Sequence, residues 1–307
     1  MGTVIDFSKR PERNISLALV LVFFYTLFAA MLGAAAKYAA NEASVISIAL
    51  WRNLVGTIVL FVGALAFPVQ NKGLHFLHTP EWKLQTIRSV SSLIAVLLYF
   101  YSLKTLPLAE ATLLLFTIPI FVPLVALIWH KVRLHREMWW GLIVSFAGIA
   151  VALNPGKSII QPAALLALLS GVMGAIAMVS LRFSHYSEPA GRTMFYNFSI
   201  AAGIMIVVSL FFFPSEWKAL NGQVFVWLVI VGVLALVAQM FLTFATRHAP
   251  IRLLSPFFYL TVIFSILLDR WIWKTELTKQ VVWGSVFIIL GNVLMLVLYP
   301  KDDLKTH

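Results

Sequence analysis

Cysteine is absent from the 307 residues of the chain. A disulfide framework and thiol chemistry are therefore excluded. Charged residues are also scarce, at 11% of the chain, whereas a soluble domain carries about a quarter. Hydrophobic residues make up 61%, which is more apolar surface than a soluble core can bury. We therefore expect the chain to lie in a lipid bilayer.

Acidic side chains are missing from the middle of the apolar segments. All 12 lie near segment ends, in connections or in the tails, and Glu110 and Asp269 come closest to a membrane interior. A proton relay through a membrane uses Asp, Glu or His inside it, so we expect no such relay. No cluster of His and acids predicts a metal, and no glycine-rich phosphate loop predicts ATP. We expect no catalytic residue and no cofactor.

Long apolar segments dominate what the chain does contain. A membrane-spanning helix needs about 20 mostly apolar residues. The sequence predicts ten such helices, at residues 15–36, 44–67, 85–103, 110–130, 138–154, 162–182, 192–213, 224–246, 251–269 and 281–299. The first segment follows Asp6 and Glu12 and is too long for the core of a cleavable signal peptide. We therefore expect it to remain as a membrane helix.

Basic residues divide unevenly between the two sets of connections. Of the 23, fifteen lie in the tails or on the same side as the tails, seven lie on the opposite side, and Arg52 lies inside a predicted span. Because cytoplasmic flanks carry the excess of Lys and Arg, we expect both termini in the cytoplasm. The basic residues do not form the clustered polar surface that nucleic acid binding requires, so we expect no nucleic acid partner.

Two landmarks recur about 143 residues apart, nearly half the chain. The string Leu103–Pro107 is similar to Thr246–Pro250, and Trp140-Gly141 recurs as Trp283-Gly284. Each half holds five predicted spans, and because five is odd, the second half crosses the membrane in the opposite sense. The sequence therefore predicts an all-α integral membrane protein with ten transmembrane helices in two inverted five-helix repeats. The predicted parts are a tail at 1–14, repeats at 15–156 and 157–300, and a tail at 301–307.

Four short motifs carry a family resemblance. They are Ile48–Leu54, Tyr101–Ala109, Glu276–Thr278 with Gln280, and the glycine pairs Gly141/Gly148 and Gly284/Gly291. Together with ten spans they resemble the drug/metabolite transporter superfamily, EamA type. Arg133 departs from the pattern, because family members often carry an acid there, as Glu276 does in the second half. The resemblance implies a bacterial inner-membrane carrier for small metabolites, often an exporter, but it implies no single substrate.

Arg52 points most directly to a binding site. It lies about eight residues into its predicted span, roughly 12 Å along a helix that rises 1.5 Å per residue. A central arginine costs about 2.5–3.5 kcal/mol on insertion scales, so it should face the bundle or a water-filled cavity. Two interpretations stay open, since Arg52 could contact the substrate or could tie helix ends through backbone carbonyls.

Polar residues in the third and eighth predicted spans share helix faces. In the third span this face holds Arg88, Ser92, Ala95, Tyr99 and Ser102. In the eighth span it holds Gln239, Thr243 and Thr246. Because the two spans are repeat counterparts and polar side chains avoid lipid, we expect both faces to line a central cavity. The alternative is hydrogen bonding between helices, worth about 0.6 kcal/mol per contact.

Further candidates are isolated polar residues in other spans. These are Asn53, Tyr25, Asn197 and Tyr259. A single tyrosine in a membrane helix often anchors it at the interface instead of binding a ligand. The complete predicted substrate-binding set is Arg52, Tyr99, Gln239, Ser92, Asn53, Asn197, Tyr259, Tyr25 and Thr243.

An apolar, aromatic cavity with one cation and a few hydroxyl and amide groups fits a small organic solute. Because no buried acid balances the arginine, an amino acid or similar metabolite with an anionic group is favoured, with nucleotide-like or vitamin-like solutes as alternatives. We expect a secondary-active or facilitative transporter that works by alternating access. An intramembrane enzyme lacks its catalytic groups here, and a scaffold does not explain the inverted halves. The expected partners are the solute and the bilayer, with a monomer or a homodimer both open.

Overall fold

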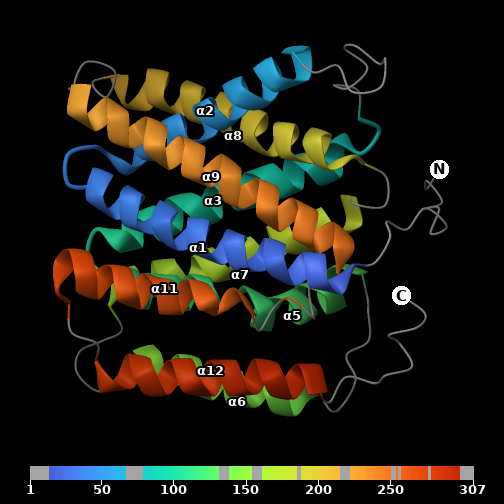
Figure 1. The fold of residues 1–307 in the computed structure, drawn as a ribbon, viewed down its shortest axis with the longest axis vertical. Coiled ribbons are helices and arrows are strands. Elements are labelled where there is room, and N and C mark those ends of the chain that lie inside the picture. The colour runs from blue at the N-terminus through green and yellow to red at the C-terminus, as the bar shows by residue number, and fades with distance from the viewer. Residues whose placement is uncertain are drawn as a thin grey trace.

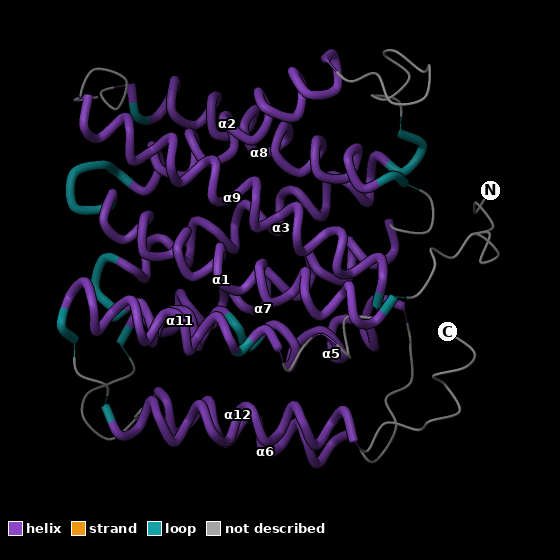
Figure 2. The backbone as a smooth tube through the Cα atoms, viewed as in Figure 1, coloured by secondary structure: helices purple, strands orange, loops and turns teal. Residues whose placement is uncertain are grey.

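The computed structural model describes residues 14–66, 79–130, 138–153, 161–184, 188–214, 222–249, 254, 257–275 and 278–297. Within these ranges the chain is a bundle of helices joined by short connections, without a strand (Figures 1 and 2). The helices are α1 (Ile15–Ala39), α2 (Val45–Ala66), α3 (Trp82–Leu103), α4 (Leu108–Leu115), α5 (Ile118–His130), α6 (Met138–Leu153), α7 (Pro162–Ser184), α8 (Ala190–Phe212), α9 (Gly222–His248), α11 (Leu260–Leu268), the π-helix η3 (Asp269–Trp273) and α12 (Lys279–Val297).

Seven described helical segments are long and apolar enough to cross a membrane. One of the seven runs from Leu108 to Trp129 and combines α4 with α5, and two shorter apolar helices lie at Trp139–Val151 and Lys279–Gly291. Helical residues occur in each of the ten ranges predicted from the sequence. The all-helical class is therefore confirmed for the described chain.

The fourth apolar segment is divided into α4 and α5 by a proline. Pro119 has no N–H to donate to the carbonyl of Leu115, so the α-helical ladder cannot continue through this point. The hydroxyl of Thr117 instead donates to the Leu114 carbonyl at 2.7 Å. Gly171 of α7 passes close to the same two carbonyls, with room for no side chain. The break therefore lies against a neighbouring helix and is not exposed to lipid.

The helix pair α6 and α12 lies side by side at one edge of the bundle (Figure 1). A Cβ added at Gly148 would lie 2.7 Å from the backbone nitrogen of Ile288 and 2.9 Å from the carbonyl oxygen of Gly284. A Cβ added at Gly291 would lie 2.6 Å from the carbonyl oxygen of Gly141. Small residues let helix backbones approach closely in a bilayer. The two contacts run in opposite order along the helices, so the pair is antiparallel.

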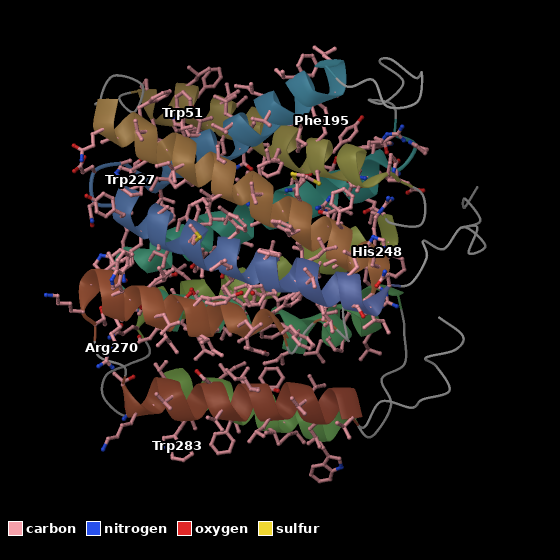
Figure 3. The ribbon with its side chains drawn as sticks, in the orientation of Figure 1. Trp51, Phe195, Trp227, His248, Arg270 and Trp283 are labelled. Atoms are coloured by element: carbon pink, nitrogen blue, oxygen red, sulfur yellow. The ribbon has the colours of Figure 1, made fainter. Side chains whose placement is uncertain are left out.

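The outer surface of the bundle is apolar. Ile128 and Trp271 are each 81% exposed and Phe211 is 77% exposed, and Figure 3 shows apolar side chains projecting outward along the helices. A soluble monomer rarely exposes contiguous apolar patches of this extent. In a bilayer the same side chains contact acyl chains, so the surface agrees with the composition of the chain.

We predict that Gly291→Leu separates α6 from α12, because the new side chain would meet Ser145 and the Gly141 carbonyl. Overpacking of this kind costs about 1–3 kcal/mol. The midpoint of thermal aggregation of the detergent-purified protein, followed by size-exclusion chromatography, should fall by several degrees. Gly203→Leu in α8 is the matched control, because nothing lies within 4 Å of a Cβ added there. Equal midpoints for the two variants would contradict the glycine contact.

Candidate functional site

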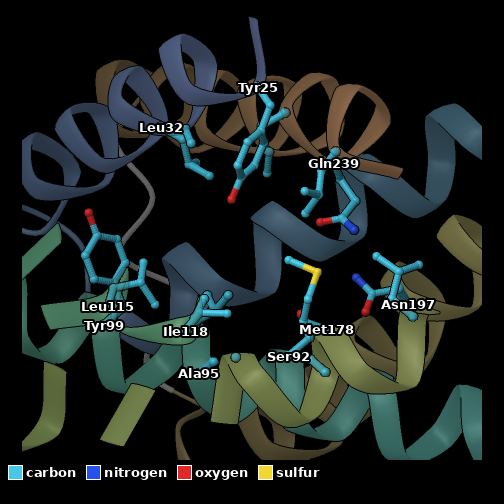
Figure 4. A pocket seen from close by; sticks show the side chains of 18 of the residues that line it. Tyr25, Leu32, Ser92, Ala95, Tyr99, Leu115, Ile118, Met178, Asn197 and Gln239 are labelled. Atoms are coloured by element: carbon cyan, nitrogen blue, oxygen red, sulfur yellow. The ribbon is translucent and has the colours of Figure 1, made fainter. Parts of the chain in front are cut away.

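A cavity of about 160 Å³ lies inside the bundle. A water molecule needs about 10–15 Å³ by this measure, so there is room for roughly ten waters or a small organic molecule. Residues from α1, α2, α3, α7, α8 and α9 line it, together with the α4–α5 break and α11. In Figure 4, Tyr25 and Gln239 lie on one side of the cavity, and Ser92 and Met178 lie on the opposite side.

Six of the nine predicted site residues line this cavity. They are Tyr25, Arg52, Ser92, Tyr99, Asn197 and Gln239. They come from five helices, α1, α2 and α3 in the first half and α8 and α9 in the second, so only the packing of the bundle brings them together. Most of the remaining lining is aliphatic or aromatic. The combination of apolar walls and a few convergent polar groups is typical of a small-molecule site.

The other three predicted residues lie outside the cavity lining. Asn53 is fully buried, and its Nδ2 donates to the carbonyl of Ala49 at 2.7 Å. Thr243 is also fully buried, and its hydroxyl has no hydrogen-bond partner within the described chain. Tyr259 is 2% exposed and belongs to the apolar core. Asn53 still bears on the site, because it contacts Arg52.

Arg52 lines the cavity and is 6% exposed. Its Nη1 donates to Oδ1 of Asn53 at 3.0 Å, and its guanidinium carbon lies 5.6 Å from the centre of the Phe198 ring. Its Nε has no partner within the described chain, where no ion pair is formed with a carboxylate. A side-chain amide therefore orients the guanidinium and leaves its positive charge without a compensating anion.

Arg88 is a second cation in the cavity wall, and it was not among the predicted site residues. It is 2% exposed, its Nη1 donates to the carbonyl of Thr193 at 2.7 Å, and its Nη2 has no partner within the described chain. The helical stripe was the signal that could have identified it, because Ser92, Ala95 and Tyr99 on the same face also line the cavity. The sequence had placed Arg88 on the face expected to line the cavity, but Arg88 was left out of the predicted substrate-binding set.

Tyr99 belongs to a hydroxyl network that joins three helices. Its hydroxyl lies 3.0 Å from Oγ1 of Thr112 in α4, and the hydroxyl of Ser265 in α11 donates to the same oxygen at 3.2 Å. Gly33 of α1 makes room for the tyrosine, since an added Cβ would lie 2.6 Å from its hydroxyl. Ser102, the last member of the predicted stripe, donates to the carbonyl of Tyr99 at 2.7 Å and does not line the cavity.

Charged side chains make contacts at both ends of the bundle. In Figure 3 the label Arg270 identifies one end and the label His248 identifies the other. At the first end, Asp269 lies 3.1 Å from Nζ of Lys37 and accepts the backbone N–H of Ala109 at 2.6 Å. Asp269 is thereby engaged with α1 and α4.

At the opposite end, the Glu188 carboxylate accepts from Thr79 at 2.5 Å and from Arg192 at 2.7 Å, and its backbone carbonyl accepts from Arg247 at 2.5 Å. These contacts join the segment before α3 to the beginning of α8 and the end of α9.

Four polar atoms on cavity-lining residues are buried without a partner in the described chain. They are Nε of Arg52, Nη2 of Arg88, Oδ1 of Asn197 and Oγ1 of Thr261. A buried polar atom without a hydrogen bond costs about 1–3 kcal/mol, so a bound polar solute or water has a place here. Among the described residues no group of His, Cys, Asp and Glu could hold a metal ion.

Comparison with known proteins agrees with this arrangement. The model of the EamA-like transporter family matches residues 16–154 and again residues 161–297. A pseudopaline exporter of Pseudomonas aeruginosa (strain UCBPP-PA14) is 24% identical over 290 residues, which cover 92% of this chain and 95% of the exporter. An S-adenosylmethionine uptake transporter of Rickettsia felis is 23% identical over 271 residues, with coverage of 88% and 89%.

An uncharacterized transporter of Helicobacter pylori (strain ATCC 700392 / 26695) is 21% identical over 289 residues, which cover 93% of this chain and 96% of that protein. A crystal structure of a protein with 19% sequence identity matches with a TM-score of 0.65, covering 94% of this chain and 100% of that chain, and shares the fold. The resemblance seen in the sequence motifs is confirmed. The two family matches together span nearly the whole chain, so the protein belongs to the EamA-like transporter family and is a multi-pass membrane transporter, not an enzyme.

Proposed function

We propose that this transporter moves a small organic metabolite with an anionic group, such as an amino acid or a similar compound, across the bacterial inner membrane. Arg52 is the observation that carries the proposal. It is a buried cation in a cavity wall, with a free N–H and no carboxylate partner in the described chain. An arginine inside a membrane protein marks a substrate path by default, and a guanidinium matches the geometry of a carboxylate.

The same proposal includes ten crossings in two inverted repeats. The antiparallel contact of α6 with α12 supports it, because Gly148 and Gly291 are repeat counterparts and meet Gly284 and Gly141, which are counterparts too. The neighbours α1 and α9 have α7 and α3 as counterparts, and these also pack together. Exchanging the two halves therefore reproduces these helix–helix contacts, as a two-fold axis in the membrane plane requires.

Residues that line the cavity are also related by the repeat. Counterparts about 143 residues apart occur together in its wall, as in Ser92 with Ala235, Val96 with Gln239, Tyr99 with Leu242 and Ile118 with Thr261. A cavity on the axis between two inverted halves is where carriers of this plan hold their substrate. These pairs support the placement of the substrate site between the halves.

The charged contacts at the two ends of the bundle support alternating access. The contact of Lys37 with Asp269 and the contacts of Glu188 lie at opposite ends. Each must loosen for the cavity to open at that end, while the other remains closed. The beginning of α1 and the end of α12 lie at the same end of the bundle in Figure 1, which supports placing both termini on one side, and the distribution of basic residues favours the cytoplasm.

Transport is proposed to proceed by exchange or down a gradient. Among the described residues that line the cavity there is no Asp, Glu or His to carry a proton, and the carboxylate of Asp269 is already engaged by Lys37 and by the N–H of Ala109. The relatives include an exporter and an uptake transporter, so the family does not favour either direction. Nothing in the cavity favours the alternative solutes, nucleotide-like or vitamin-like, over a small anion.

Arg52→Gln should remove most of the transport activity. A thermal-shift screen of the purified protein against amino acids, nucleosides, nucleotides and vitamins first identifies a ligand, because binding stabilises the folded state. Uptake of that ligand into proteoliposomes should then fall at least about 30-fold in the variant, since a buried anion left unpaired costs about 2–5 kcal/mol. Arg270→Gln is the control, because it removes an equal charge from an exposed position. Unchanged uptake by Arg52→Gln would exclude Arg52 from the site.

Counterflow should not depend on a pH gradient. Proteoliposomes loaded with unlabelled ligand should accumulate labelled ligand at the same rate before and after a protonophore collapses the gradient, because the cavity wall described holds no proton-carrying side chain. Empty proteoliposomes provide the control for leakage. Arrest of counterflow by the protonophore would contradict the exchange mechanism.

A further inference from the structure

We propose that the cavity binds a solute with two anionic groups, one held by Arg52 and the other by Arg88. This inference rests on the proposed function, because both arginines act in the same cavity. It narrows the substrate from a metabolite with one anionic group to a small organic dianion, for which a dicarboxylate is the simplest case.

Both guanidinium groups retain hydrogen-bonding capacity. A guanidinium carries five N–H donors in a fixed planar fork. Arg52 uses Nη1 on Asn53, and Arg88 uses Nη1 on the carbonyl of Thr193. Nε of Arg52 and Nη2 of Arg88 are buried without partners in the described chain, and both residues line the cavity. Each arginine is thus oriented by a hydrogen bond to the protein and has at least one donor left.

The charges of both arginines are uncompensated. Among the cavity-lining residues that the structure describes there is no Asp or Glu. The ion pairs Lys37–Asp269 and Arg192–Glu188 involve other residues, at the ends of the bundle. Removing a guanidinium from water costs several kcal/mol unless an anion is close. A solute with one anion compensates one arginine and leaves the second unpaired. A solute with two anions compensates both.

Arg52 of α2 and Arg88 of α3 contact different residues of α8. Arg88 contacts the carbonyl of Thr193, whereas the guanidinium of Arg52 lies over the ring of Phe198. These points are separated by five residues, about 7.5 Å along the helix axis. Asn197 lies between them in the sequence and presents an unpartnered amide oxygen in the cavity wall (Figure 4). Because the two arginines contact α8 residues more than one helical turn apart, two carboxylates on a short carbon chain suit them better than a single anion shared by both.

The experiment measures binding to the full-length protein in detergent by isothermal titration calorimetry. The probes are glutarate, adipate and pimelate, each compared with its monomethyl ester, which keeps the carbon chain between the two carboxyl carbons but removes one charge. At least one dicarboxylate should bind the wild-type protein ten times more tightly than its ester, or better. Arg88→Gln should weaken that dicarboxylate to the affinity of the ester and should change the ester itself less than twofold.

Lys83→Gln is the matched control, because it removes a positive charge from the same helix at an exposed position. Arg88→Lys keeps the charge and should keep the preference for the dicarboxylate. Equal binding of dicarboxylates and esters to the wild type, a test that does not depend on any variant, would overturn the inference. Equal weakening of both probes by Arg88→Gln would also overturn it, by assigning Arg88 a purely structural role.

Arg52→Gln separates the two proposals. Loss of all binding in this variant, combined with no preference for dicarboxylates in the wild type, would refute the second anionic group and leave the proposed function intact. Retention of full binding in Arg52→Gln would refute the anion site at Arg52 and the dianion inference with it. No binding of either probe class to the wild type would overturn the dianion inference alone.

Discussion

A polar group inside a bilayer must find its partner within the protein, and this constraint shapes the molecule. Backbone groups satisfy it by forming helices, and hydroxyls satisfy it on their own helix, as Thr26, Ser89 and Ser180 do by donating to carbonyls three or four residues earlier. Of the ten buried side-chain atoms without a partner in the described chain, four belong to residues of one cavity. Four of the unmet hydrogen bonds therefore lie where a solute can complete them.

The scaffold repeats, but the polarity of the cavity does not. Ser92 has Ala235 as its counterpart, Val96 has Gln239, and Tyr99 has Leu242, and all six line the cavity. Each pair sets one polar side chain against one apolar side chain. Packing contacts such as those of the four glycines between α6 and α12 are shared by both halves, since either half must hold the bundle together. Recognition has no such requirement, because a solute does not have to contact both halves through the same groups.

Much of the fold could be predicted because the bilayer acts locally on the sequence. Its thickness demands an apolar segment of about 20 residues for every crossing. Composition and segment length were therefore enough to predict an all-helical structure. The short motifs were enough to indicate the family. Helical periodicity predicted that Ser92 and Tyr99 share a face with Arg88. The point at which the fourth segment divides could not be predicted from proline alone, because Pro119 lies next to the break whereas Pro123 lies inside the helix α5.

The sequence by itself determined that this protein lies in a bilayer, that it is helical, which family it belongs to and which helix faces carry polar side chains. Each of these properties depends on residues that are close together in the sequence, within one helical turn or one membrane span. Only the tertiary structure decided which of those faces meet. It placed Asn197 and Gln239 in the wall of the same cavity as Arg52 and Arg88, brought Asn53 into hydrogen-bond contact with Arg52, and left Thr243 and Tyr259 outside the cavity lining. Those outcomes depend on contacts between helices far apart along the chain, and no local pattern encodes how two helices rotate about their axes when they pack.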